Sequence, residues 1–360
     1  MPSSVYIHIP FCKSKCHYCS FVSFDRLELK DKYLEALETE IKSNYDGEIL
    51  KTLYFGGGTP SLLKVRDFER LIKHFNLDNN AEVTVECNPD DINEDFLANL
   101  NSLGLNRLSF GCQTFNDDIL KKINRRHNSA QIFKTVKIAQ SVGFDNISLD
   151  FIYGLPDQTE QMFYDDLRRG IDLGIQHISL YGLTIEDGCY FASHKPQNLP
   201  DEDKQADMYL GAVEFLTKFG FEHYEISNFS LAGYNSRHNL NYWNNNEYYG
   251  FGVAAHGYKN GVRYSNKENI QDYINNPLEP IQFHVETEQE RLEEEIFLGF
   301  RRMSGIDIEF INKKYGIDFE QRYKTILKKY ATFLTRTKRG YTLTSRGVLV
   351  SNTILAEFLS

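Results

Sequence analysis

The amino-acid sequence predicts an α/β fold in which a large parallel barrel is followed by a smaller helical domain. The chain has 360 residues, which is too long for one ordinary domain but suits a barrel with an appendage. Its first 230 residues alternate short β-rich runs with longer segments of helical period, a pattern typical of parallel βα units. Apolar residues make up 41% and charged residues 25% of the chain, and these fractions exclude a fibrous or disordered protein.

The expected barrel strands are short and mostly apolar, as strands buried on both faces are. Between them we expect helices, and the segment 61–75 shows the clearest helical spacing, through Leu62, Phe68, Leu71 and Phe75. About six parallel strands would form a closed or partly open barrel, whose functional groups lie at the C-terminal strand ends. The expected strands are residues 5–9, 52–55, 82–87, 107–110, 147–153, 177–183 and 223–226.

The chain changes character after the expected barrel. Aromatic and Asn residues dominate 234–249, and short strands punctuated by glycine are expected over 250–264. Later, 336–344 is expected to form a hairpin that turns at Arg339 and Gly340, which, with helices around it, indicates a winged-helix-like arrangement. We therefore expect three parts, which are residues 1–230, 231–285 and 286–360.

Charge and hydropathy limit the possible partners and location. The chain carries 40 Lys and Arg against 50 Asp and Glu, and this net charge of −10 disfavours broad nucleic-acid binding. Eight Lys and Arg between Arg322 and Arg346 are interpreted as a solvated face. No apolar stretch reaches the ~18 residues of a membrane-spanning helix, and the N-terminus does not resemble a signal peptide. We expect no nucleic acid, no transmembrane anchor and a cytoplasmic location.

Three of the six cysteines, Cys12, Cys16 and Cys19, follow the first expected strand in a CxxxCxxC pattern. Such a loop brings three thiolates together, which suits either zinc, with His8 or His17 as a fourth ligand, or an iron–sulfur cluster. In a four-iron cluster, three cysteines leave one iron free to bind another molecule. The remaining cysteines, Cys87, Cys112 and Cys189, are expected to be buried reduced thiols.

The cysteine pattern after a first barrel strand resembles the radical S-adenosylmethionine (SAM) superfamily. The segment from Tyr6 to Cys12, with Tyr18 before the third cysteine, is similar to relatives of oxygen-independent coproporphyrinogen III oxidase. This resemblance implies a partial (β/α)6 TIM-like radical SAM barrel with a C-terminal helical, winged-helix-like domain. It also implies a 4Fe-4S cluster on Cys12, Cys16 and Cys19, and SAM bound at the fourth iron.

Polar groups and glycines at the expected strand ends form a candidate SAM pocket. A glycine turn exposes backbone groups to a ligand, a carboxylate can accept from ribose hydroxyls, and an arginine can pair with a carboxylate. Helix capping or loop anchoring is the alternative for each polar residue, and Arg126 could exchange roles with Arg125. The resemblance assigns Tyr6, Tyr18, Gly57, Gly58, Thr59, Glu86, Gln113, Arg125 and Asp150 to SAM.

Two local features separate branches of the family. The oxidase pattern CxxxCxxCxC has a fourth cysteine where this chain has Phe21, and phenylalanine there resembles the HemW-like branch. His238, Tyr242 and Trp243 match the HNxxYW pattern of haem-carrying HemW proteins. An imidazole can bind haem iron and aromatic rings can stack on a porphyrin. A packed histidine is the alternative interpretation, and His256 is a second candidate ligand.

The resemblance therefore implies a haem chaperone that carries a cluster and SAM and transfers haem to an acceptor protein. An electron donor for the cluster is a further implied partner. The alternative is the oxidase itself, an enzyme that oxidatively decarboxylates coproporphyrinogen III to protoporphyrinogen IX. A third hypothesis is a binding module with a structural zinc ion at the cysteine loop.

Overall fold

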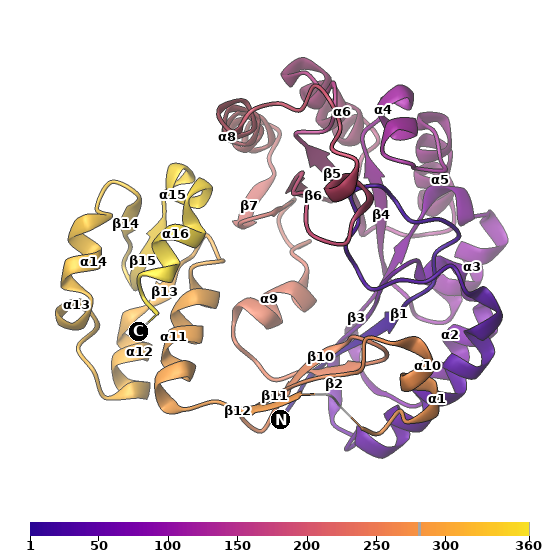
Figure 1. The fold of residues 1–360 in the computed structure, drawn as a ribbon, viewed down its shortest axis with the longest axis horizontal. Coiled ribbons are helices and arrows are strands. Elements are labelled where there is room, and N and C mark those ends of the chain that lie inside the picture. The colour runs from indigo at the N-terminus through magenta and orange to yellow at the C-terminus, as the bar shows by residue number, and fades with distance from the viewer. Residues whose placement is uncertain (280–281, 360) are drawn as a thin grey trace.

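The computed structural model describes residues 1–279 and 282–359, and its centre is a curved sheet of nine strands (Figure 1). Six strands are parallel and neighbour one another in sequence order, which confirms the predicted partial (β/α)6 barrel. These strands are β1 (Ser4–Ile9), β2 (Ile49–Gly57), β3 (Asn76–Cys87), β4 (Arg107–Gln113), β5 (Ile147–Tyr153) and β6 (His177–Gly182).

The two edges of the sheet are extended by short strands. β8 (Asn228–Ser230) lies antiparallel to β6 and is followed outward by β7 (Glu222–Glu225), which was expected as the seventh strand. At the other edge β9 (Tyr249–Phe251) runs parallel to β1. Within the described residues β7 and β9 are not paired with each other, so the barrel is open on one side.

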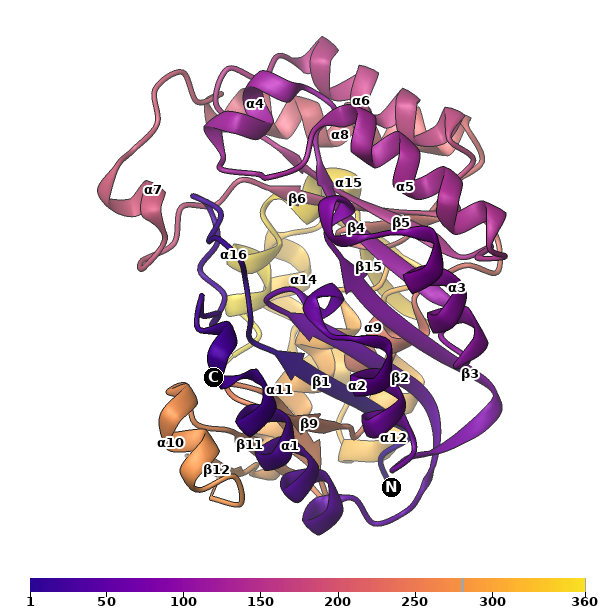
Figure 2. The same cartoon turned by 90° about the vertical axis from the view of Figure 1, so that its right-hand side faces the viewer.

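Helices cover the outer face of this sheet (Figure 2). The segment 61–75, expected as one helix, is instead interrupted, because Leu63 and Lys64 have extended backbones. The Asp67 side chain accepts from the Lys64 backbone amide at 2.9 Å and starts a new helix there. The helical elements are η1 (Leu27–Leu29), α1 (Lys30–Asn44), η2 (Pro60–Leu62), α2 (Val65–Ile72), η3 (Pro89–Asp91), α3 (Glu94–Ser102), α4 (Asp117–Lys122), α5 (Ser129–Ser141), α6 (Glu160–Asp172), α7 (Tyr190–Ser193) and α8 (Glu202–Lys218).

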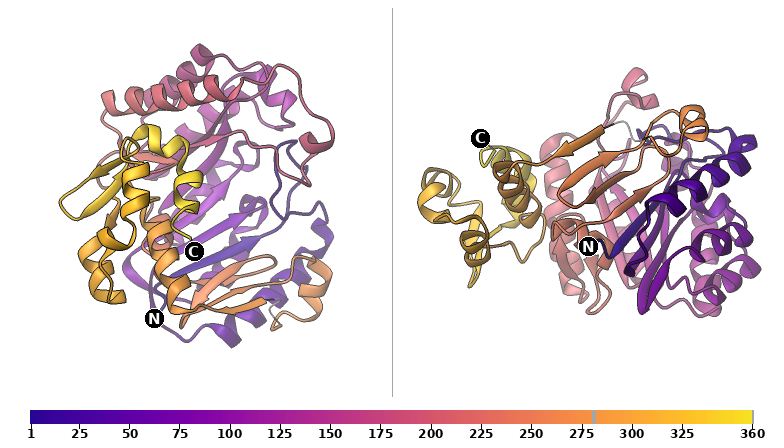
Figure 3. Two further views of the ribbon diagram at one scale, coloured as in Figure 1. Left: turned by 60° about the vertical axis from the view of Figure 1, so that its left-hand side comes forward. Right: turned by 90° about the horizontal axis from the view of Figure 1, so that it is seen from below.

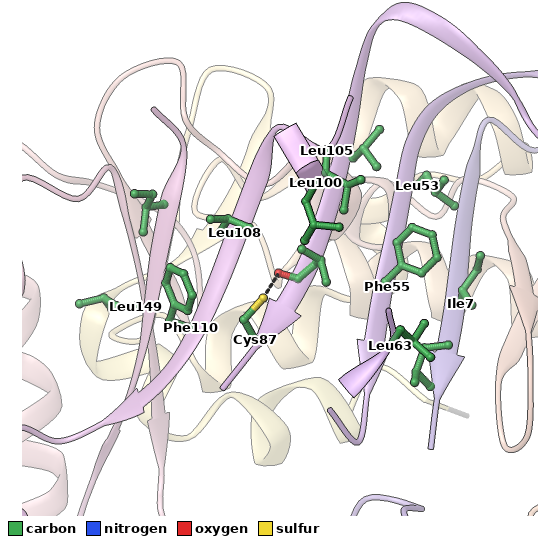
Figure 4. Packing of buried hydrophobic residues seen from close by; sticks show 14 of the residues in the cluster. Ile7, Leu53, Phe55, Leu63, Cys87, Leu100, Leu105, Leu108, Phe110 and Leu149 are labelled. Carbon is green, nitrogen blue, oxygen red and sulfur yellow. Dashed lines mark hydrogen bonds between the residues drawn. The ribbon is translucent and has the colours of Figure 1, made fainter. Parts of the chain in front are cut away.

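The main core lies between the strands and the outer helices (Figure 4). Ile7, Phe55 and Phe110 are completely buried there. Cys87, Cys112 and Cys189 are also buried free thiols, as predicted. Because side chains alternate along a strand, the residues between these apolar ones face the inside of the barrel. That inner face is where the polar side chains described below meet.

After the barrel strands the chain forms a helix and a second sheet. In Figure 1, α9 (Arg237–Trp243) lies between the barrel and the C-terminal part. An antiparallel sheet in the order β10-β11-β12 follows. Its elements are β10 (His256–Lys259), β11 (Val262–Ser265), α10 (Ile270–Asn275) and β12 (Gln282–Val285).

The C-terminal part is mostly helical and stands beside the open side of the barrel (Figure 3). The expected hairpin is present as β14 and β15, with Thr335 opposite Thr342, and β13 adds a third strand. A separate apolar cluster around Ile296, Phe319 and Ile354 includes Tyr209 of α8. These elements are α11 (Glu288–Gly299), β13 (Ile306–Asp307), α12 (Ile308–Tyr315), α13 (Phe319–Arg322), α14 (Lys324–Lys329), β14 (Leu334–Arg336), β15 (Gly340–Leu343), α15 (Ser345–Leu349) and α16 (Ser351–Ala356).

No helix in the described ranges combines the length and the apolar character that crossing a membrane requires.

Candidate functional site

The cysteine loop follows β1, and backbone hydrogen bonds close its base. The Cys12 amide donates to the Phe24 carbonyl at 2.9 Å, and the Phe24 amide donates to the Pro10 carbonyl at 2.7 Å. Cys12, Cys16 and Cys19 are half-buried free thiols on this one loop. Across residues 1–279 and 282–359, no three Cys, His, Asp or Glu side chains are grouped closely enough for a single metal ion.

Two polar side chains contact the loop sulfurs. Thr59 Oγ1 is hydrogen-bonded to Cys12 Sγ at 3.5 Å, and Arg125 Nη1 donates to Cys16 Sγ at 3.4 Å. The other Arg125 amino group donates to the Asn88 side chain at 2.7 Å and the Gly111 carbonyl at 2.6 Å. This arginine is therefore fixed in place as a cation beside the sulfurs.

These contacts test whether the loop fits an iron–sulfur cluster. Three thiolates bring negative charge, and the Arg125 guanidinium offsets it at short range. Burial raises the pKa of Cys19 to about 11, so iron must displace its proton on binding. Three cysteine donors and an adjacent cation fit a cluster whose fourth iron is open to another ligand.

The glycine turn at the end of β2 lies against β1. Gly57 has a φ of +113°, and a Cβ there would lie 2.6 Å from His8 Cε1. A Cβ at Gly58 would lie 2.8 Å from the Phe11 carbonyl oxygen. Only glycine allows this approach, and it brings Thr59 to the cysteine loop.

Carboxyl groups on the inner face continue this pocket. Glu86 accepts from the Tyr54 hydroxyl at 2.8 Å and from the Gly57 amide at 3.1 Å. Burial raises the pKa of Glu86 to about 7. Asp150 accepts from the Ser109 hydroxyl at 3.1 Å, and burial raises its pKa as well. Glu86 lies near the end of β3, as expected, whereas Asp150 lies in the middle of β5 and not at its end. Desolvated carboxyl groups on this inner face can accept from hydroxyls of a bound ligand.

Gln113 ends β4 at a register shift and has a φ of +68°. A non-glycine residue in this conformation costs about 1–3 kcal/mol, and such positions cluster at ligand sites. Gln113 is buried at this irregular end of β4.

Both predicted tyrosines are linked to the cysteine loop. The Val22 carbonyl can only accept, so His8 Nε2 donates to it at 2.9 Å and His8 Nδ1 accepts from the Tyr6 hydroxyl at 3.0 Å. His8 is therefore occupied on both ring nitrogens and serves as a loop anchor, which leaves it unavailable as the fourth ligand in the alternative zinc site. Tyr18 is hydrogen-bonded to Cys16, and burial raises the pKa of its phenol.

His238 lies deep inside the barrel and is 1% exposed. Its Nδ1 is hydrogen-bonded to Thr52 Oγ1 and its Nε2 to the Tyr242 hydroxyl, both at 2.8 Å. The ring stacks on Tyr54 with centroids 4.8 Å apart. Burial lowers the pKa of His238 to about 3. The imidazole is therefore neutral, and both ring nitrogens are used inside the protein.

The position of α9 explains this burial. The amides of Arg237 and His238 donate to Glu82 of β3 at 2.9 and 3.0 Å, so the helix begins against the sheet. Thr52 pairs with Ser4, five residues before Ile9 at the other end of β1. His238 also stacks on Tyr54, which pairs with Tyr6, so at ~3.3 Å per residue its contacts lie roughly 10–16 Å along the strand from the end of β1. None of these contacts joins His238 to the three loop cysteines.

A cavity of about 560 Å³ lies beside the cysteine loop, within the range of about 300–1,000 Å³ that is usual for ligand pockets. Phe21 is 68% exposed at its edge, and the exposed His256 reaches it from β10. The aromatic residues of 234–249 were noted in the sequence and supply part of the cavity wall. The rest of the wall comes from segments that lie far apart in the sequence, so the cavity itself could not be predicted. Its residues are Tyr6, His8, Ser20, Phe21, Val22, Tyr242, Trp243, Tyr248, Ala254, His256, Arg263, Glu294 and Leu298.

Residues 6–170 match the family model described as Radical SAM superfamily, and residues 287–350 match the HemN C-terminal domain. The chain is 38% identical to a protein of Lactococcus lactis subsp. lactis called heme chaperone HemW, over 99% of this chain and 97% of that protein. It is 37% identical to the protein of the same name in Bacillus subtilis, over 99% of each chain.

Among solved structures, the fold is similar to coproporphyrinogen III oxidase (HemN) from Escherichia coli, which is described as a radical SAM enzyme. The TM-score is 0.88 at 25% identity, and the match covers 100% of this chain and 90% of the other.

Proposed function

Since the chain belongs to the HemW family of radical SAM proteins, we propose that it binds haem and transfers it to an acceptor protein. Relatives similar over nearly their full length bear the name heme chaperone, and the aromatic cavity supports the same function here. A porphyrin is flat and apolar on both faces, so Phe21, Tyr242 and Trp243 would offer it matching surfaces. This cavity beside the cysteine loop is the observation that carries the proposal.

The proposal includes two cofactors. Cys12, Cys16 and Cys19 would hold a 4Fe-4S cluster, because they form one loop with Arg125 as a neighbouring cation. SAM would bind between the cluster and the strand ends, on Tyr6, Tyr18, Gly57, Gly58, Thr59, Glu86, Gln113, Arg125 and Asp150. When bound together, the cluster supplies an electron that can cleave SAM.

The same proposal covers the division of the chain into domains and its partner proteins. We propose that residues 1–230, 231–285 and 286–360 act as barrel, connecting region and C-terminal domain. An acceptor protein and an electron donor would be partners in the cytoplasm.

The second candidate is the oxidase, which the structural similarity to coproporphyrinogen III oxidase favours. Phe21 stands where the oxidase pattern has its last cysteine, and its side chain lies at the cavity edge. The oxidase would convert coproporphyrinogen III to protoporphyrinogen IX, whereas the chaperone would leave the porphyrin ring system unchanged.

The two functions can be separated with one anaerobic preparation. The chain is reconstituted with iron and sulfide, analysed for metal, and incubated with hemin and then with apomyoglobin as a probe acceptor. We expect the preparation to contain iron and sulfide, without stoichiometric zinc, and to bind hemin. The bound hemin should then pass to apomyoglobin faster than the same amount of hemin does from serum albumin, which serves as the control. A parallel incubation with reductant, SAM and coproporphyrinogen should leave the substrate intact, and formation of protoporphyrinogen would contradict the proposed function.

A further inference from the structure

We propose that a buried row of hydrogen bonds couples SAM binding in the barrel to α9, the helix that carries the predicted haem motif. The row consists of Asp150, Ser148, His177, Tyr224 and Ser236, and we call it the barrel network. The inference rests on the proposed function, since Asp150 is one of the proposed SAM residues. His177 and Tyr224 are positioning residues in this network, because they act through the groups at its two ends.

The barrel network joins β5, β6 and β7 to the start of α9. Ser148 and His177 pair across β5 and β6, and Ser148 Oγ lies 2.8 Å from His177 Nδ1. The Tyr224 hydroxyl lies 2.8 Å from the other ring nitrogen and accepts from the Ser236 amide at 3.1 Å. At the opposite end, Ser148 Oγ lies 3.5 Å from Asp150 Oδ1. The network therefore extends from a proposed SAM residue to the residue that caps α9.

The barrel network lies inside the protein. Ser148, His177 and Ser236 are completely buried, and Tyr224 is 8% exposed. Burial lowers the pKa of His177 well below its usual value, and the positive charge of Arg107 adds to this effect. The imidazole is therefore neutral and has a single N–H to donate. In such surroundings hydrogen bonds are stronger than in water and polarise one another.

The hydrogen bonds of the network all point the same way. The Ser236 amide can only donate, so the Tyr224 oxygen accepts and its own hydrogen is left for His177 Nε2. The neutral ring then carries its hydrogen on Nδ1 and donates to Ser148, whose hydroxyl is left to donate to Asp150. A row of bonds with one direction is strengthened by negative charge at its accepting end. The Asp150 carboxylate therefore helps to hold the start of α9.

Asp150 is the point at which SAM binding can act on the network. Its carboxylate accepts from Ser109 at 3.1 Å and from Ser148 at 3.5 Å, and Ser179, which also lies 3.5 Å from Ser148, donates to it as well. Two carboxylate oxygens offer about four acceptor positions. On accepting from the ribose hydroxyls of SAM, Asp150 would lose its long contact with Ser148 first. The network should then weaken, and the start of α9 should open more readily.

The test is amide hydrogen exchange over 236–243 in the full-length chain, reconstituted with its cluster and kept without reductant so that SAM stays intact. Saturating SAM, with its binding measured by equilibrium dialysis, should accelerate exchange roughly fivefold, which corresponds to one hydrogen bond. Unchanged or slower exchange with SAM bound would overturn the inference and leave the proposed function standing. A chain that takes up no SAM would contradict the proposed SAM site, and the inference with it.

Matched substitutions separate this coupling from a structural role. Ser148→Ala interrupts the network beside Asp150 and leaves the contact between Tyr224 and Ser236 in place, yet the response of α9 to SAM should disappear. Tyr224→Phe interrupts the network at its other end and should abolish the response as well. Ser109→Ala removes another hydroxyl from the same carboxylate but lies outside the network, so it should keep the wild-type response. A wild-type response in Ser148→Ala or in Tyr224→Phe would overturn the inference.

The same coupling should reach haem, because Tyr242 and Trp243 of α9 line the cavity. Two ligands that act on one equilibrium change each other's affinity by the same factor. In a hemin titration, SAM should therefore raise the dissociation constant of the wild type roughly fivefold and leave that of Ser148→Ala unchanged. A wild-type constant that does not respond to SAM would overturn the coupling to haem. A chain that binds no hemin would overturn the proposed function, while the exchange experiment would still decide the coupling between SAM and α9.

Discussion

Replacing His238 by alanine should loosen α9 without altering the rest of the barrel. The change removes the hydrogen bonds to Thr52 and Tyr242, each with a net contribution of about 1 kcal/mol. It also leaves a buried Thr52 hydroxyl without its partner and a cavity beside Tyr54, which together add about 1–2 kcal/mol. We therefore expect the local opening of α9 to become easier by about 3 kcal/mol.

Amide hydrogen exchange measures this opening directly, because it reports local as well as global unfolding. A change of about 3 kcal/mol corresponds to roughly a hundredfold faster exchange over 237–243. Amides of α5 serve as the internal control and should not change. Tyr242→Phe removes only one of the two hydrogen bonds and should accelerate exchange about fivefold, and combining it with His238→Ala should add little. Unchanged exchange of α9 in His238→Ala would refute the structural role of this histidine.

Three further substitutions test the pocket at the strand ends. Gly58→Ala places a Cβ against the Phe11 backbone and should displace the cysteine loop, so reconstituted iron per chain should fall; full iron content would contradict the close approach. Arg125→Met removes the cation beside Cys16 and should lower the cluster reduction potential by on the order of 100 mV in a redox titration, and an unchanged or higher potential would contradict this. Burial raises the pKa of Glu86 from 4.5 to about 7, so its protonated form favours folding and this contribution is lost as pH rises from 4.5 to 7. Glutamine does not titrate, so Glu86→Gln should lose up to about 3 kcal/mol less stability than wild type between pH 4.5 and 7. The thermal midpoint of the variant should therefore depend less on pH, and a slope like that of wild type would contradict this.

The barrel could be predicted from sequence because its strands are local features. Residues 147–153 are an apolar run with helices on both sides, and β5 has these same bounds. The interruption at Leu63 could not be predicted from helical spacing, because the apolar residues keep their period across it. What breaks the helix is a hydrogen bond from the Lys64 backbone to Asp67, and it does not change the hydrophobic pattern.

The parts of the site that depend on the spacing of residues along the chain could be predicted from the sequence. The parts that depend on packing between distant segments could not. Thr59 and Cys12 meet because both directly follow neighbouring parallel strands. The side on which His238 faces was not predictable, because Glu82 and Thr52 come from strands more than 150 residues earlier in the chain. The exposure of the His256 side chain was not predictable either, because it depends on which side chains the fold places around it.

One wall of the cavity belongs to α11, through Glu294 and Leu298, while the opposite wall comes from β1 and the cysteine loop. A fragment that stopped at Glu286 would retain every barrel strand and all three loop cysteines, yet its cavity would lie open to solvent along one side. For the proposed function, we expect such a truncation to weaken haem retention more than cluster assembly. For the same reason, grafting a C-terminal domain from another family member onto this barrel would close the cavity again while leaving the cysteine loop as it is.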